Sequence, residues 1–382
     1  MTNADTHASP TSQSPPRAAL RSTVFGTAKT IAIGVVGGAL FASVGTPLPW
    51  LSGSALAVAI AALAGQKLNV APSVRTLTLV FLGATMGAAV KPETLQSLQQ
   101  WPLSLVGLGV AVVAMMIASQ LYLRHVHGFE PTTAKLAAVP GALPYVLALA
   151  EADARTDVRR VAIVQTLRLS CLLMALPGLF ALLGVGQANG GAETPPNADL
   201  AVAALGAEVL ADLAILFAAA GVAAWVAARI RLPAGALFGP MIAGAALYAS
   251  GAVTADLPDW LMLPGFVVIG AMVGAHFDGT DLRLFGATVV AGILSLVVGS
   301  AAAMAVAIPV AATLGLSLPQ VWLAYAPGGV ETMSILALAL GFDAAYVAGH
   351  HAVRFLGLGL LVPFWLGRPP ADQDVPSDRP RP

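Results

Sequence analysis

Long apolar runs are the feature of this 382-residue sequence that most restricts its fold. The first such run extends from Val24 to Val44, and a helix of about twenty apolar residues crosses the ~30 Å hydrocarbon core of a bilayer. Backbone groups in lipid must hydrogen-bond within the chain, so apolar runs without strand-like alternation predict helices. Only 10% of the residues are charged, which is too few to cover a soluble surface. We therefore expect an all-α polytopic membrane protein.

The predicted spans fall into two groups, separated by a polar linker at 186–206 that contains no Lys or Arg. Each group also contains one apolar segment that Pro and Gly interrupt. The terminal segments 1–23 and 367–382 are rich in small polar residues and proline, and are predicted to be disordered. The spans are expected at about 24–45, 48–64, 73–90, 103–123 and 159–185, then 207–228, 235–252, 262–277, 285–314 and 345–366, with the interrupted segments at 134–150 and 320–340.

The second group repeats the first in sequence. Residues 81–88 match residues 268–275 at an offset of 187, and Pro140-Gly141 matches Pro327-Gly328 at the same offset. Arg168 matches Arg354 at an offset of 186. One register held over so much chain predicts two homologous membrane repeats, at 24–185 and 207–366.

The distribution of Lys and Arg predicts the orientation. Positive residues before the first span and in alternate loops favour cytoplasmic N- and C-termini in a bacterial inner membrane. If the interrupted segments are re-entrant, each repeat has five spans, and the second repeat is inverted relative to the first. If they cross fully, each repeat has six crossings and the repeats are parallel. The charge pattern favours the inverted arrangement.

The two interrupted segments are the predicted binding region. Proline lacks a backbone donor and glycine unwinds easily, so a half-helix beginning after either break would present free N–H groups and a positive dipole end. Such ends suit a carboxylate, and interrupted helices at matching positions of inverted repeats mark substrate sites in transporters. A simple kink in a packed helix is the alternative. The candidate substrate-binding residues here are Pro140, Gly141, Tyr145, Pro327, Gly328 and Gly329.

Charged and titratable residues inside apolar segments supply further candidates. Glu331 could bind substrate or carry a proton, or could pair with an arginine for structure alone. His350 and His351 could relay protons, and Arg354 could clamp a substrate carboxylate or neutralise Glu331. A purely structural role, as polar contacts that hold two helices together, is the alternative for His350, His351 and Arg354. In the first repeat, Gln165 and Arg168 occupy the places of His351 and Arg354 and are also candidate binding residues.

The sequence carries no sign of several other functions. The formal net charge is zero, so the sequence lacks the excess of positive charge that is typical of nucleic-acid-binding proteins. Neither the single cysteine, Cys171, nor the spacing of the six histidines predicts a metal site or a cofactor. We therefore expect lipid and a small solute as partners, with a homo-oligomer left open by the glycine-rich helix faces.

These motifs together resemble the AbrB-type membrane protein family over about 24–366. The resemblance is carried by residues 48–53, the Gly83/Gly87 and Gly270/Gly274 stretches, Pro140-Gly141-Ala142, residues 326–333, and the His350-His351-Ala-Val-Arg354 motif. It implies a duplicated membrane domain, and Gln165 and Arg168 as the first-half version of the His-His-Arg motif. Members are often labelled ammonia monooxygenase or transcriptional regulator, and the family brings no substrate with it.

We expect a secondary transporter of a small solute, with an anion and proton coupling as open possibilities. The alternatives are a membrane sensor that affects gene expression indirectly and, less favoured, a membrane-bound monooxygenase. An enzymatic role is not expected, because no cluster of metal ligands emerges from the sequence.

Overall fold

The computed structural model describes residues 17–88, 101–141, 143–184, 207–232, 234–255 and 259–366, and within these ranges the regular elements are all helical. The predicted all-α fold is therefore confirmed. The helices of the first half are α1 (Arg17–Ser43), α2 (Pro49–Leu63), α3 (Pro72–Ala88), α5 (Trp101–His125), α6 (Pro131–Ala138), α7 (Leu143–Ala152) and α8 (Val158–Leu182). Those of the second half are α10 (Ala207–Arg229), α11 (Gly235–Ala249), α12 (Leu263–Ala275), α13 (Leu282–Leu314), α14 (Leu318–Tyr325), α15 (Val330–Ala339) and α16 (Ala344–Leu366), with a 3₁₀ turn η2 (Asp259–Met262) before α12.

Six helices in the described part of the chain are long and apolar enough to cross a membrane, namely α1, α5, α8, α10, α13 and α16. Their outer faces expose large apolar side chains, such as Phe25 on α1 and Trp225 on α10, which lipid contact requires. The apolar helices α2 and α11 have 15 residues each, roughly 22 Å of rise, and are shorter than a full crossing. Five full crossings per half therefore stay a prediction.

One boundary differs from the sequence prediction. Helix α1 begins at Arg17, inside the segment 1–23 that was predicted to be disordered. The helix extends beyond the apolar run because residues 17–21 are Arg, Ala and Leu, which are strong helix formers. Residues 1–16, the predicted linker 186–206 and the predicted tail 367–382 lie outside the described residues.

Both apolar segments with Pro and Gly are interrupted helices, as predicted. The first consists of α6 and α7, separated by residues 139–142, and the second consists of α14 and α15, separated by residues 326–329. The helices α6 and α14 have eight residues each, and α7 and α15 have ten each. Each pair therefore breaks after the same number of turns in its own half.

Helix packing between the halves is reciprocal. Helix α2 packs against α12, and α3 packs against α11. A Cβ added at Gly83 would overlap the backbone of Leu237, and one added at Gly270 would overlap the backbone of Leu51, so only glycine permits this approach. These contacts are what the predicted duplication requires, although the duplication itself stays a prediction.

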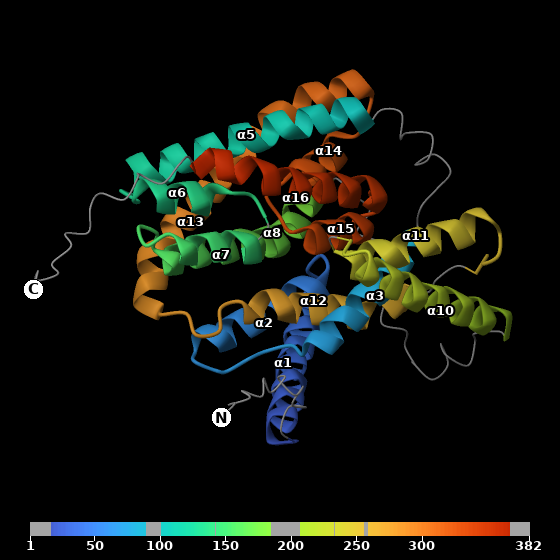
Figure 1. The fold of residues 1–382 in the computed structure, drawn as a ribbon. Helices are drawn as coiled ribbons and strands as arrows, with labels where there is room; N and C mark the ends of the chain where they lie inside the picture. Colours follow the sequence, from blue (N-terminus) through green and yellow to red (C-terminus); the bar gives the residue numbers. More distant parts are fainter. Residues whose placement is uncertain are drawn as a thin grey trace, which may run out of the picture.

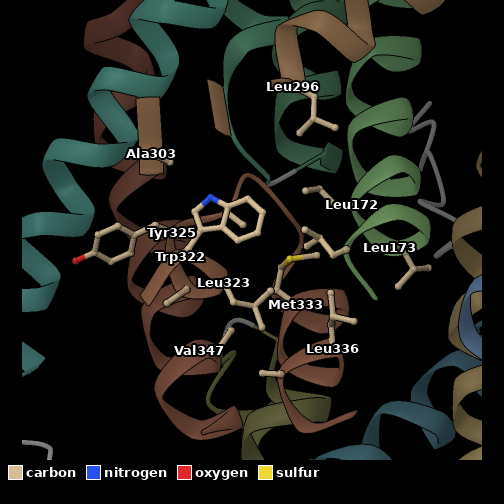
Figure 2. Packing of buried hydrophobic residues seen from close by; sticks show 14 of the residues in the cluster. Leu172, Leu173, Leu296, Ala303, Trp322, Leu323, Tyr325, Met333, Leu336 and Val347 are labelled. Carbon is tan, nitrogen blue, oxygen red and sulfur yellow. The ribbon is translucent and has the colours of Figure 1, made fainter. Parts of the chain in front are cut away.

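The interrupted segments occupy the middle of the molecule. Figure 1 shows α7, α8, α15 and α16 between α5 above and the group of α2, α3 and α12 below, with α10 and α11 at one side. A large core holds the second interrupted segment in place, and Figure 2 shows Trp322 of α14 and Met333 of α15 packed with Leu172 and Leu173 of α8. The segment is thus embedded in side chains of both halves.

Candidate functional site

Each interrupted segment leaves helix-terminal carbonyl groups inside the protein. Helix α6 ends at the C-cap Val139 and α14 ends at the C-cap Ala326, both with extended backbone. The last carbonyls of a helix have no intrahelical partner, and leaving them unpaired in an apolar interior is costly. Each half must therefore bring in donors from another helix.

In the first half, α8 supplies these donors. Gln165 Nε2 donates to the carbonyls of Leu136 and Val139, each at 3.1 Å. Arg168 Nη2 donates to the Val139 carbonyl at 2.8 Å and to Gln165 Oε1 at 2.7 Å. Arg168 is only 5% exposed, and its Nε has no hydrogen-bond partner among the described residues. Gln165 and Arg168 thus close the end of α6.

In the second half, α16 has the same arrangement with histidine in place of glutamine. His351 Nε2 contacts the Leu323 carbonyl at 3.1 Å, and Arg354 Nη1 donates to the Ala326 carbonyl at 2.6 Å. Arg354 Nη2 donates to the Gly328 carbonyl and to His351 Nδ1. A carbonyl can only accept and a guanidinium can only donate, so His351 is a neutral imidazole with its proton on Nε2.

The two breaks meet at a cavity of about 370 Å³. Gly141 has φ +82°, a conformation that side chains disfavour, and a Cβ placed on it would lie 3.3 Å from both Arg354 Nη2 and the Gly328 carbonyl oxygen. The cavity is lined by residues of both breaks and of α3, α7, α8, α11, α12, α15 and α16. Its polar lining comprises Arg75, Gly141, His276, Gly328, Gly329, Glu331, Thr332, His351 and Arg354.

An ion pair between the halves lies at this cavity. Arg75 Nη2 of α3 and Glu331 Oε1 of α15 are 2.8 Å apart, and the side chains are 50% and 24% exposed. Glu331 is therefore paired with Arg75 and not with Arg354, the partner suggested by the sequence. Among the described residues, the other ion pairs join Asp153 with Arg155 and Asp157 with Arg160. Neither Arg168 nor Arg354 has a carboxylate partner in that part of the chain.

Comparison with known proteins places the chain in a family. The sequence profile of the AbrB family, described as the transition state regulatory protein AbrB, matches residues 50–368. This chain belongs to the AbrB family.

Two curated relatives align along most of their length. A protein of Escherichia coli (strain K12) named "Putative regulator AbrB" is 26% identical over 324 residues, which are 85% of this chain and 90% of the relative. A protein of Bacillus subtilis (strain 168) named "Uncharacterized protein YhjN" is 26% identical over 356 residues, which are 88% of this chain and 91% of the relative. The alignments therefore cover most of this chain.

His350 of this AbrB-family chain lies away from the cavity, although it was a candidate for proton coupling. Its Nδ1 donates to the Tyr346 carbonyl at 2.8 Å, and its Nε2 lies 2.9 Å from Ser104 Oγ of α5. Ser104 Oγ also contacts the hydroxyls of Tyr346 and Tyr325, and Tyr325 donates to the Ser104 carbonyl at 2.5 Å. We call Ser104, Tyr325, Tyr346 and His350 the Ser104 cluster. It connects α5, α14 and α16 by buried hydrogen bonds.

The structure brings together seven of the predicted site residues at the cavity, which are Pro140, Gly141, Gly328, Gly329, Glu331, His351 and Arg354. Tyr145, Gln165, Arg168, Pro327 and His350 do not line it. Arg75 and His276 also line the cavity but were not predicted as site residues from the sequence. The signal that could have identified them was a charged or titratable side chain at the end of an apolar span.

Proposed function

We propose that this AbrB-family protein is a secondary transporter of a small anionic solute, located in a bacterial inner membrane with both termini cytoplasmic. The observation that carries the proposal is Arg354. Its guanidinium is 5% exposed, lines the cavity and has no carboxylate partner among the described residues. A cation inside a membrane protein is expensive unless an opposite charge accompanies it. A solute anion in the cavity would supply that charge.

The end of a half-helix supports the same assignment. Helix α15 begins at Val330 on the cavity, and its N-cap residue Gly329 provides no side-chain hydrogen bond. The first N–H groups of a helix lack intrahelical partners and carry the positive end of its dipole. An anion beside Gly329 would therefore meet both the α15 terminus and the Arg354 guanidinium.

The arrangement of the two halves supports transport in preference to catalysis. Secondary transporters bind substrate between repeats, where interrupted helices meet, and expose the site alternately by moving one repeat against the other. Here Pro140 and Gly141 of the first break and Gly328 and Gly329 of the second line the same cavity. The reciprocal packing of α2 on α12 and of α3 on α11 supplies matching surfaces that such a movement needs.

Glu331 is the best candidate for proton coupling. It reaches the cavity, and among the described residues its hydrogen-bond and ion-pair partner is Arg75, so accepting a proton would release Arg75 and change the charge of the site. His351 is less suited, because both of its nitrogens already have partners whose roles are fixed. His350 belongs to the Ser104 cluster and does not reach the cavity.

The test is uptake into proteoliposomes. Wild type, Arg354→Lys and Glu331→Gln would be compared for accumulation of labelled acetate, lactate, hexanoate and succinate, with and without an inward proton gradient. Arg155→Lys is the matched control, since Arg155 pairs with Asp153 and does not line the cavity. We expect uptake by wild type and Arg155→Lys, loss of uptake in Arg354→Lys, and gradient-independent uptake in Glu331→Gln. Equal uptake by wild type and protein-free vesicles for every anion would contradict the proposal.

A sensor is the second candidate function, because the relative in Escherichia coli is named a regulator. It would use the same cavity for binding without translocation. Anion binding that depends on Arg354, together with no uptake into proteoliposomes, would favour the sensor over the transporter.

A further inference from the structure

The charges around the cavity leave a single positive charge for a ligand. Arg75 and Glu331 form an ion pair, so their charges cancel. His351 is neutral because its two nitrogens bond to the Leu323 carbonyl and to the Arg354 guanidinium. Arg168 lies behind the lining and does not reach the cavity. An imidazole is mostly uncharged at neutral pH, so His276 is expected to add little charge there. Arg354 is then the one uncompensated cation among the described residues that line the cavity, and one positive charge matches a monoanion better than a dianion.

The rest of the lining is apolar and surrounds the charged end. Leu143, Leu169, Ile269 and Val273 come from α7, α8 and α12, and further side chains come from α11 and α16. A fully hydrated anion gains nothing from such walls, since the anion loses water and the apolar side chains gain no contact. The volume of about 370 Å³ lies within the range of about 300–1,000 Å³ in which proteins enclose organic ligands. An inorganic anion or acetate would leave most of it unfilled.

One wall of the cavity is shared with a second, apolar groove. Phe238 of α11 and Ala352 of α16 line both spaces, and the groove has a volume of about 350 Å³. Beyond these two residues, the groove is lined by Trp101, Leu232, Met241, Ile242, Ala345, Gly349, Val353 and Leu356. Phe238 and Ala352 therefore form a wall between the cavity and the groove.

We propose that the ligand of this site is an amphipathic organic monoanion, whose charged head lies at Arg354 and whose apolar body contacts the α8, α11 and α12 walls and ends against Phe238. The assignment rests on the proposed function for its biological meaning and specifies the class of solute. Each methylene added to the ligand removes apolar surface from water until the chain reaches Phe238.

The test is equilibrium binding to the full chain in lipid nanodiscs, measured by calorimetry with protein-free nanodiscs subtracted. The probes are the alkyl carboxylates from propionate to hexanoate, with adipate as the six-carbon dianion and hexanol as the uncharged analogue. We expect affinity to rise about fourfold per added methylene, equivalent to about 0.8 kcal/mol. We also expect hexanoate to bind at least tenfold more tightly than adipate or hexanol. Adipate or hexanol binding as tightly as hexanoate, or no binding of any probe, would overturn the inference.

Variants of the shared wall supply a second test. With the series extended to octanoate and decanoate, Phe238→Ala is expected to open the cavity toward the groove and to move the optimum chain length to a longer carboxylate than in wild type. Ala352→Leu fills the space near Phe238 and is expected to move the optimum toward butanoate, which keeps the test available if Phe238→Ala does not fold. Met241→Ala is the matched control, since Met241 lines only the groove. An optimum that is unchanged in both wall variants would overturn the inference.

The proposed ligand class and the proposed transport function can be contradicted separately. Preferential hexanoate binding without uptake into proteoliposomes would uphold the ligand class and contradict the transporter. Uptake of succinate in preference to hexanoate would uphold the transporter and overturn the ligand class. Phosphatidylglycerol, a lipid with one negative charge, in the nanodisc separates a bilayer source of the ligand from an aqueous one, because a lipid ligand would displace hexanoate competitively.

Discussion

Arg168 and Arg354 hold equivalent places in the two halves, yet they face different surroundings. Arg168 directs Nη2 toward Val139 and Gln165, and it is closed off from the cavity. Arg354 makes the corresponding bonds to Ala326 and His351, and it also lines the cavity. The same device, an arginine that satisfies the carbonyl end of a half-helix, is structural in one half and available to a ligand in the other.

The side chains beside the two arginines also differ. In the first half, Gln165 offers an acceptor oxygen to its arginine and donors to two carbonyls. In the second half, the acidic Glu331 occupies the first turn of α15 and draws Arg75 of the first half toward the cavity. A scaffold with two such segments can therefore keep one of them closed while the other is open to a ligand.

Exchanging each arginine for glutamine should reveal the largest difference between the two halves. Arg354→Gln should lower the affinity for hexanoate about 10- to 100-fold, because a charged hydrogen bond contributes about 1.5–3 kcal/mol. Arg168→Gln should reduce that affinity by less than about threefold, since Arg168 does not touch the ligand. Calorimetry with both variants measures the ratio, and equal losses of affinity would mean that Arg354 has no special role.

A methyl group at the first break should give the next largest effect. Gly141→Ala should destabilise the protein by about 1–2 kcal/mol, because Gly141 has φ +82° and an added Cβ would press on Arg354 Nη2. Gly329→Ala is the matched control, as its φ is negative and an added Cβ would meet only ordinary contacts. Thermal unfolding in detergent compares the two. Equal midpoints would show that the breaks tolerate side chains alike.

Much of the fold was predictable because its determinants are local. Runs of apolar residues gave the helices, and Pro-Gly pairs gave both interruptions, since proline and glycine act on the backbone where they stand. The grouping of Pro140, Gly141, Glu331 and Arg354 was also predictable from the repeat. The pairing of Arg75 with Glu331 was not, because those residues are separated by 256 positions and meet only through packing of α3 and α15.

The direction of individual side chains was the other unpredictable feature. His350 and His351 are neighbours in sequence, but helix geometry turns successive side chains by about 100°. His350 consequently joins the Ser104 cluster, whereas His351 joins the cavity. Which of the two faces the ligand depends on the rotation of α16, and the spacing of the motif does not specify that rotation.

A variant in the Ser104 cluster tests whether His351, and not His350, faces the ligand. Ser104→Ala removes the partner of His350 and of two tyrosine hydroxyls, so we expect destabilisation by about 1–3 kcal/mol. Hexanoate affinity and the gradient dependence of uptake should be unchanged, because the cluster does not reach the cavity. Thermal unfolding and uptake are the two measurements. Loss of proton coupling in a folded Ser104→Ala protein would indicate that His350 takes part in proton coupling.

The ion pair between the halves should contribute least to stability. Arg75→Gln should change the free energy of unfolding by less than about 1 kcal/mol, since the Arg75 side chain is half exposed. Its effect should appear in transport, where the unpaired Glu331 carboxylate would repel the anion and weaken its binding. The double variant Arg75→Gln/Glu331→Gln should recover part of that affinity. No recovery would mean that Glu331 does not face the bound anion.

The most direct test of the whole account is uptake of labelled hexanoate by proteoliposomes that carry wild type, Arg168→Lys or Arg354→Lys. Lysine keeps the charge but loses the planar set of donors that a guanidinium offers to carbonyls and a carboxylate together. We predict uptake by wild type and by Arg168→Lys, and little or none by Arg354→Lys at matched levels of folded protein. Uptake that is equally reduced in both variants, or that survives in Arg354→Lys, would contradict the assignment of the second interrupted segment as the binding half.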